Sequence, residues 1–277
     1  MLACGSANRK GDATTRARLE ATETRLARIT ERLEILETKT GNLDGVGEGV
    51  QLLLQRLDEL GAQGGAEQAA RKRPSSTATY SLPIDDDPFL GPKDAKVTIV
   101  NGYDFYCGFC DQVRPTLHKL QSIYGKDLKI VFKNFVIHDE VARLPALAAC
   151  AAHQQDKFMP MFEQIWEQGI RARRELNEGH LMAIAKSLKL KEKKFVADMR
   201  GPCEDKVQLD FELLTAVGAT GTPAFFINGR FLSGALSIDK YQRVIDQELE
   251  KSNRAIKAGT KVEDYYQSLV DSGRKSL

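Results

Sequence analysis

The pattern of hydrophobic and polar positions separates a polar N-terminal part from a C-terminal part with short apolar runs. No aromatic residue occurs between positions 12 and 73. Apolar residues there form two series with a seven-residue spacing, offset by three positions, at Leu19, Leu26 and Leu33 and at Ile29, Leu36, Leu43, Val50 and Leu57. Such series, with Arg and Glu at most outer positions, are typical of the a and d positions of a coiled coil.

Glycines at positions 41, 45, 47 and 49 interrupt the second series. Because glycine disfavours a continuous helix, the pattern predicts two helices, about 13–40 and 48–61, with a flexible joint between them. We interpret residues 13–61 as a coiled-coil arm that assembles the chain into a homo-oligomer of undefined strand number. The alternatives are a helix that docks on the chain's own C-terminal domain and a partly helical spacer.

Residues 62–79 are rich in Gly, Ala, Gln, Ser and basic residues, which is typical of a linker. Beyond residue 80 the pattern predicts strands at 97–100, 129–135, 224–227 and 230–232, the last two joined by the hairpin turn Asn228-Gly229. It predicts helices at 113–124 and 241–249, a mostly helical stretch at 139–217 and a helical tail at 251–277. This order indicates a small mixed sheet with helices packed around it.

Composition and charge narrow the class of protein. Apolar residues make up 42% and charged residues 28% of the chain, which is ordinary for a globular protein. The 40 basic and 38 acidic residues leave a net charge of +2, which argues against a strongly electrostatic partner such as nucleic acid. No apolar run reaches the roughly 18–20 residues that cross a bilayer. We expect a soluble protein, or one tethered by something other than a helix.

Among the five cysteines, Cys107 and Cys110 form a CxxC pair where a predicted strand ends and a helix begins. A cysteine at a helix N-terminus faces free backbone N–H groups that stabilise its thiolate, and the thiolate is the attacking species. We expect Cys107 to be an exposed nucleophile and Cys110 to be a shielded thiol that resolves mixed disulfides.

A zinc site is the alternative interpretation of the CxxC pair. It would require a second Cys or His pair. Cys150 and Cys203 are isolated in the sequence, and the four histidines are scattered singly. We therefore expect no bound metal.

Pro223 directly precedes the predicted strand 224–227. A proline at the start of a strand can adopt the cis form in a tight turn, and an ordinary trans turn is the alternative. Beside Cys107, a cis proline would leave the backbone groups of Thr222 free to pair with an extended substrate segment.

Small residues precede Cys4, as at the end of a bacterial lipoprotein signal. The basic and apolar parts of such a signal are not in the sequence. We interpret Cys4 as a lipidation site on a tether formed by residues 1–12, and a chance cysteine in an N-terminal tail is the alternative.

Three motifs, in order, resemble a known family. They are Asp87-Pro88-Phe89-Leu90-Gly91-Pro92-Lys93-Asp94, Asp104-Phe105-Tyr106-Cys107-Gly108-Phe109-Cys110 and Gly221-Thr222-Pro223-Ala224-Phe225-Phe226-Ile227-Asn228-Gly229. Residues 80–250 are similar to the DsbA-like branch of thioredoxin-fold disulfide oxidoreductases, and the arm lies outside the resemblance. The resemblance implies an α/β thioredoxin-like fold with a helical insertion at about 139–217 and no cofactor. It also implies a redox pair, Cys107 and Cys110, with substrate contacts from Gly108, Phe109, Thr222 and a cis Pro223.

The sequence departs from this family at two places. Asn101 stands six residues before Cys107, where an acidic residue is common, so proton transfer at Cys110 would use water, Asp104 or Lys133. The dipeptide between the cysteines, Gly-Phe, is not the Pro-His pair of the strongly oxidising members. Without a histidine to stabilise the reduced thiolate, we predict a weaker oxidant.

Cys150 lies in an apolar helical segment, and Cys203 opens the last helix before the final strands. Unpaired cysteines are uncommon in oxidising compartments. We therefore predict a stapling disulfide between them, and two buried thiols are the alternative.

These features predict a periplasmic or extracytoplasmic thiol–disulfide oxidoreductase that acts on secreted proteins by oxidation or isomerisation. Several active sites on one coiled coil would favour isomerisation. A non-catalytic periplasmic chaperone or scaffold is the alternative. A redox enzyme for small molecules is disfavoured because it needs no resolving cysteine. The pattern identifies neither the substrate proteins nor a redox partner.

Overall fold

The structure, a computed structural model, describes residues 74–277. Cys4, the arm at 13–61 and the linker up to residue 73 lie outside the described residues, and what we expect of them stays a prediction. Within residues 74–277, no helix combines the length and the apolar character needed to span a bilayer.

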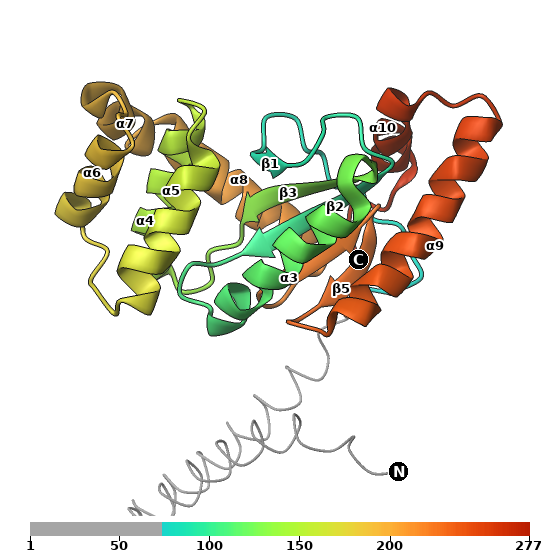
Figure 1. Cartoon of the computed structure of the whole chain (residues 1–277), viewed down its shortest axis with the longest axis horizontal. Coiled ribbons are helices and arrows are strands. Elements are labelled where there is room, and N and C mark those ends of the chain that lie inside the picture. Colours follow the sequence, from blue (N-terminus) through green and yellow to red (C-terminus); the bar gives the residue numbers. More distant parts are fainter. Residues whose placement is uncertain (1–73) are drawn as a thin grey trace, which may run out of the picture. The chain divides into compact units, whose positions relative to one another are not determined.

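A five-stranded sheet in the order β1-β3-β2-β4-β5 forms the centre of the domain (Figure 1). Its strands are β1 Phe89–Leu90, β2 Val97–Tyr103, β3 Leu128–Asn134, β4 Ala224–Ile227 and β5 Arg230–Ser233. β2 and β3 run parallel, and the other pairs are antiparallel. The predicted mixed sheet and its four longer strands are confirmed, whereas the two residues of β1 are too few to form a pattern.

Helices cover both faces of this sheet. They are α3 Gly108–Tyr124, α8 Pro202–Ala216, α9 Ile238–Lys257 and α10 Val262–Ser272, and a 3₁₀ turn, η1 Gly125–Asp127, follows α3. Ile99 belongs to one core cluster with Leu117 of α3 and Tyr241 of α9. Its neighbour Val100 belongs to a second cluster with Leu214 of α8 and part of α10. Successive strand residues point to opposite faces, so α3 and α9 cover one face and α8 and α10 cover the other.

The helical insertion lies beside the sheet, between β3 and β4 (Figure 1). It contains α4 Asp139–His153, α5 Phe158–Gln164, the π-helical η2 Ile165–Arg171, α6 Glu178–Ser187 and α7 Glu192–Met199, and α8 leads back to the sheet. The ring of Phe162 lies 5.2 Å from that of Tyr103 and 5.1 Å from that of Phe132. Such aromatic pairs each add about 0.5–1.5 kcal/mol beyond their burial. They join the insertion to the sheet.

The two ends of the described chain pack on the domain. We expected a linker at 62–79 and a helical tail at 251–277, and α10 belongs to the same compact unit as the sheet. Tyr266 Oη donates to the carbonyl of Leu82 at 2.9 Å. Arg274 N donates to the carbonyl of Thr79 at 2.9 Å, and Tyr80 forms a bridge with Arg274. The contacts of Thr79 and Tyr80 with Arg274 are made by backbone atoms and do not depend on side-chain periodicity, so the pattern did not reveal them.

A substitution at Gly229 tests how closely the Tyr80 segment packs against the turn between β4 and β5. It has a φ of +80°, and an added Cβ would lie 2.6 Å from the carbonyl oxygen of Tyr80. Gly234 has a φ of +87° but nothing within 4 Å of an added Cβ, which makes it a matched control. Both Gly→Ala changes carry the left-handed backbone cost of about 1–2 kcal/mol. Gly229→Ala should lower the free energy of unfolding by about 1–3 kcal/mol more, since it also overpacks.

Urea unfolding followed by circular dichroism measures both variants. Equal losses of stability at the two positions would show that the Tyr80 segment does not dock against Gly229.

Candidate active site

The turn between β2 and α3 places the CxxC pair at the end of the central strand. Cys107 is the residue before α3, with an extended backbone, φ −86° and ψ 111°. Its N–H donates to the carbonyl of Asp104 at 3.1 Å, and its own carbonyl accepts from Cys110 N at 2.9 Å. The predicted order of strand, CxxC and helix is therefore present, and backbone N–H groups at the start of α3 lie beside the Cys107 sulfur.

The buried carboxylate of Asp104 holds this turn in place. Its Oδ1 accepts from Tyr106 N at 2.7 Å. Its Oδ2 accepts from Ile137 N at 2.8 Å and His138 N at 2.9 Å, and lies 3.0 Å from Nδ1 of His138. Asp104 thus joins the CxxC turn to the segment that follows β3. We considered Asp104 as a proton carrier, but its oxygens are occupied by these donors.

Cys107 and Cys110 are both free thiols. The Thr222–Pro223 peptide bond is cis, and the Cys107 thiol donates to the carbonyl of Thr222 at 3.2 Å. Cys107 is only 7% exposed, so our expectation of an exposed nucleophile was wrong. The Thr222 segment lies against its sulfur, a contact between residues 115 positions apart that no local pattern shows. The two residues between the cysteines, Gly108 and Phe109, are exposed, and Phe109 is 63% exposed.

The two thiols ionise very differently. The pKa of Cys107 is lowered to about 6, first because the Cys110 thiol can donate a hydrogen bond to the Cys107 sulfur. The backbone N–H groups of Phe109 and Cys110 act in the same direction, whereas burial opposes them. Burial is the main cause that raises the pKa of Cys110, and the contact with Cys107 raises it further. At neutral pH the pair therefore combines a thiolate at Cys107 with a protonated thiol at Cys110.

Lys133 lies in a buried charge cluster on the other face of the sheet. Its Nζ is 2.5 Å from Asp87 Oδ2 and 3.1 Å from Asp210 Oδ1. Lys206 of α8 pairs with the same two carboxylates, and Asn134 N donates to Asp210 Oδ2 at 3.0 Å. Lys133 therefore neutralises buried acids and faces away from the cysteines, so our suggestion that it moves a proton at Cys110 was wrong. Sequence reasoning missed this cluster, although the four-residue spacing of Lys206 and Asp210 was a signal.

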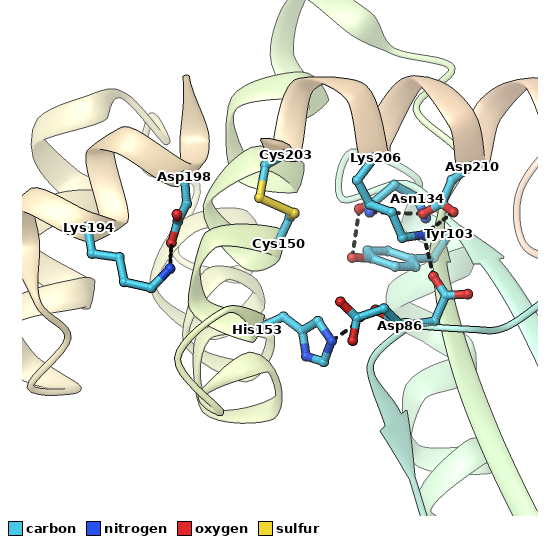
Figure 2. The surroundings of a disulfide bond; sticks show 11 residues. Asp86, Tyr103, Asn134, Cys150, His153, Lys194, Asp198, Cys203, Lys206 and Asp210 are labelled. Carbon is cyan, nitrogen blue, oxygen red and sulfur yellow. Dashed lines mark hydrogen bonds and ion pairs between the residues drawn. A yellow bond between two sulfur atoms is a disulfide. The ribbon is translucent and has the colours of Figure 1, made fainter. Parts of the chain in front are cut away.

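A disulfide joins Cys150 of α4 to Cys203 in the first turn of α8 (Figure 2), with an S–S distance of 2.10 Å and a Cα–Cα distance of 5.7 Å. The two cysteines are 53 residues apart in the sequence. In the chain-entropy model, closing a loop of this length stabilises the fold by about 4 kcal/mol. Figure 2 shows that Cys203 lies on the same helix as Lys206 and Asp210. The bond therefore ties the insertion to the helix that carries the charge cluster.

A second polar network connects α3 to the insertion, and sequence reasoning missed it. Arg114, whose side chain is 7% exposed, donates to Asp111 at 2.7 Å and also to Glu163. Its guanidinium lies 5.4 Å from the ring centroid of Trp166. Arg171 donates from Nε to Asp111 Oδ2 at 3.0 Å. The carboxylate that follows Cys110 in sequence is thus paired with two arginines, and the three-residue spacing of Asp111 and Arg114 was the available signal.

Among residues 74–277, no group of three or more His, Cys, Asp or Glu side chains is arranged to hold a metal ion.

The fold is thioredoxin-like, and it carries a pair of thiols at the junction of β2 and α3. Residues 98–246 match the family model of the DSBA-like thioredoxin domain, and the chain belongs to this family. The predicted fold class, with its helical insertion, and the resemblance stated from the three motifs are confirmed.

Two curated relatives illustrate the match. A Na(+)/H(+) antiporter NhaA of Herminiimonas arsenicoxydans is 31% identical over 175 residues, which are 62% of this chain and 27% of that protein. Disulfide bond formation protein D of Bacillus subtilis is 27% identical over 176 residues, which are 60% of this chain and 79% of that protein. The chain spans only about a quarter of the length of the first antiporter relatives.

Solved structures share the fold. BdbD from Bacillus subtilis, in its oxidised form, superposes with a TM-score of 0.55 at 24% identity, over 65% of this chain and 100% of that chain. Proteus mirabilis ScsC in a transitional conformation superposes with a TM-score of 0.51 at 20% identity, over 81% of this chain and 95% of that chain.

The lowered pKa of Cys107 predicts how its reactivity changes with pH. Since the thiolate is the reactive form, alkylation of the reduced protein by iodoacetamide should accelerate as pH rises and level off above a midpoint near pH 6. An ordinary cysteine would show its midpoint about two to three pH units higher. Mass spectrometry of the first modified residue identifies the thiol. A midpoint above about pH 8, or first labelling at Cys110, would contradict the assignment.

Proposed function

We propose that Cys107 and Cys110 are the redox pair of this oxidoreductase and that it exchanges disulfides with proteins outside the cytoplasm. The observation that carries the proposal is the position of the Cys107 sulfur. It lies at the start of α3 with a lowered pKa, next to a cis peptide bond whose carbonyl it contacts. Burial of Cys110 completes the division between an attacking and a resolving thiol.

Oxidation of a substrate begins with a Cys107–Cys110 disulfide. A substrate thiolate attacks the Cys107 sulfur, Cys110 leaves and takes up a proton, and a second substrate thiolate then releases Cys107. The substrate dithiol is oxidised and the enzyme disulfide is reduced. Isomerisation begins with the Cys107 thiolate, which attacks a wrong substrate disulfide and is released when another substrate thiolate attacks the mixed disulfide. If substrate rearrangement stalls, Cys110 resolves the mixed disulfide.

The surface around Cys107 suits an extended protein segment. Thr222 lies against the Cys107 sulfur. Phe109, 63% exposed between the two cysteines, offers an apolar contact. Gly108 has nothing within 4 Å of an added Cβ, so the backbone is open there. We infer that Thr222 and Pro223 present backbone groups to the substrate and that Gly108 and Phe109 contact the residues next to its cysteine.

The biological setting is part of the same proposal. A disulfide at Cys150–Cys203 supports an oxidising compartment, the periplasm or the exterior. The name of the Bacillus subtilis relative, disulfide bond formation protein D, supports protein substrates. We propose that Cys4 carries a lipid anchor and that the arm at 13–61 assembles a homo-oligomer, which favours isomerisation. A non-catalytic chaperone or scaffold is the alternative, and the divided ionisation of the two thiols disfavours it.

The pKa of Cys107 predicts a moderate oxidant. A very low nucleophile pKa stabilises the reduced form and makes a disulfide strongly oxidising, as in DsbA, where the pKa is about 3.5 and the potential about −120 mV. With a pKa near 6, this protein should have a clearly more negative potential. Equilibration with glutathione buffers, read by alkylation and gel shift, measures it. A potential at or above about −120 mV would contradict the prediction.

Refolding of ribonuclease tests the proposed activity. Wild-type protein should recover activity from scrambled or from reduced ribonuclease, and Cys107→Ser should lose at least about 10²-fold because the nucleophile is removed. Cys150→Ala/Cys203→Ala, which removes the other pair of cysteines, is the control and should keep the activity. Full activity in Cys107→Ser would favour the chaperone alternative.

A chain that lacks residues 1–73 tests the role of the arm separately from that of the CxxC pair. If the arm supports isomerisation, this chain should lose activity on scrambled ribonuclease and keep its oxidation of reduced ribonuclease. If full-length and shortened chains both only oxidise reduced ribonuclease, the isomerase proposal is wrong.

A further inference from the structure

A cavity beside the Cys150–Cys203 disulfide has no part in the proposed redox function. It has a volume of about 240 Å³ and is lined by residues of α4, α5 and α8, the segment before β1 and the end of β3. This is smaller than the roughly 300–1,000 Å³ of sites for drug-sized ligands, so it suits a small molecule. His153 and Asp86 both line it, and His153 Nε2 lies 3.1 Å from the carbonyl oxygen of Asp86 (Figure 2). The cavity therefore lies between the insertion and the sheet.

One of the two sulfur-bearing residues borders this cavity. Cys150 lines it and is 6% exposed, whereas Cys203 does not line it and is 0% exposed. In thiol–disulfide exchange the attacking thiolate must contact one of the two sulfurs, and the other sulfur leaves. A small thiol in the cavity would therefore attack Cys150, and Cys203 would be the leaving thiol.

Cys203 is well placed to leave as a thiolate. It is the second residue of α8, a helix of 15 residues, and a helical side chain points back toward the N-terminus. The positive end of the helix dipole stabilises a thiolate there, and a stabilised thiolate is a better leaving group. The neighbouring carboxylate of Glu204 is paired with Arg143 and does not cancel this effect.

The wall of the cavity carries an excess of negative charge. Asp87 and Asp210 line it, and Lys133 and Lys206 each pair with both carboxylates. These two lysines balance two acids. Asp86, which is exposed and lines the same cavity, adds a third carboxylate. A ligand with an ammonium group is therefore favoured over one with a carboxylate.

We propose that this cavity admits a small aminothiol, which exchanges with the Cys150–Cys203 disulfide. The thiolate of the aminothiol attacks Cys150 Sγ and forms a new S–S bond with it. The old S–S bond breaks, and its electron pair passes to Cys203, which takes up a proton from water. Attack by the Cys203 thiolate on Cys150 reverses the step and releases the aminothiol. Cys150 is thus a reversible modification site, and while it is modified α4 and α8 are no longer covalently joined.

Exchange rates of three thiols of similar size test the charge preference. They are cysteamine with a positive charge, mercaptoethanol with none and mercaptoacetate with a negative charge. The protein is the full-length chain with Cys4→Ser, Cys107→Ser and Cys110→Ser, so that only the Cys150–Cys203 pair can react. Samples are quenched with acid, and mass spectrometry locates the mixed disulfide. Each rate is divided by that of the same thiol on hydroxyethyl disulfide, which corrects for differences in thiol reactivity.

After this division, cysteamine should react about tenfold faster than mercaptoacetate, and the thiol should appear first on Cys150. Asp86→Asn should reduce this contrast about threefold, because it removes the unbalanced charge. Asp85→Asn removes the adjacent exposed charge, which does not line the cavity, and as the matched control it should keep the contrast. No exchange, no preference for cysteamine, an equal effect of the two variants, or first modification of Cys203 overturns the proposal.

Gln154→Trp tests whether the thiol reaches the disulfide through the cavity. Gln154 is exposed and lines the cavity, so a larger side chain there should narrow it without disturbing the core. All three thiols should react more slowly, while the urea midpoint stays close to that of the parent. An unchanged rate would show that the disulfide is reached by unfolding, and would overturn the proposal. Because the CxxC pair is absent from these proteins, no outcome depends on the proposed redox function.

Discussion

Seven residue pairs join β2 to β3 in parallel register, and all the residues of both strands are buried. A parallel pair needs a crossover, and a sheet buried on both faces needs helices on each side. α3 supplies the crossover and covers one face, and α8 covers the other. Because α3 begins shortly after β2 ends, the sulfur of Cys107 lies at the positive N-terminal end of a helix, next to the C-terminal end of the central strand. The position of the thiolate is thus a consequence of strand pairing.

The buried charged side chains of the domain lie in clusters that supply their own partners. One cluster, with Asp87, Lys133 and Asp210, neutralises itself on the α8 face. Another surrounds Arg114 between α3 and the insertion. Asp104, which is next to the cysteines in sequence, is occupied by backbone donors of the loop after β3. Each of these buried charged groups therefore has partners of its own within the fold.

Side-chain periodicity predicted the main strands, the helical insertion and the 113–124 part of α3 correctly, because each depends on residues close in sequence. It did not predict contacts between residues that are far apart in the sequence. Lys133 of β3 forms an ion pair with Asp210 of α8, a residue far away in the sequence, and no local pattern indicates this pair. The π-helical turn at Ile165–Arg171 has apolar residues that also suit an ordinary α-helix. Tyr80 and Arg274 meet through backbone atoms, which do not alter the hydrophobic pattern.

The CxxC pair, its place between a strand and a helix, and the proline before β4 are local features, and the sequence by itself determined them. Tertiary structure decided the environment of the two sulfurs. It brings Thr222 from 115 residues away against Cys107, and it buries Cys107 to 7% and Cys110 to 3% exposure. The physical reason is that a thiol's ionisation depends on burial and on nearby donors and charges. In a folded chain those neighbours come from strands and loops that are distant in sequence.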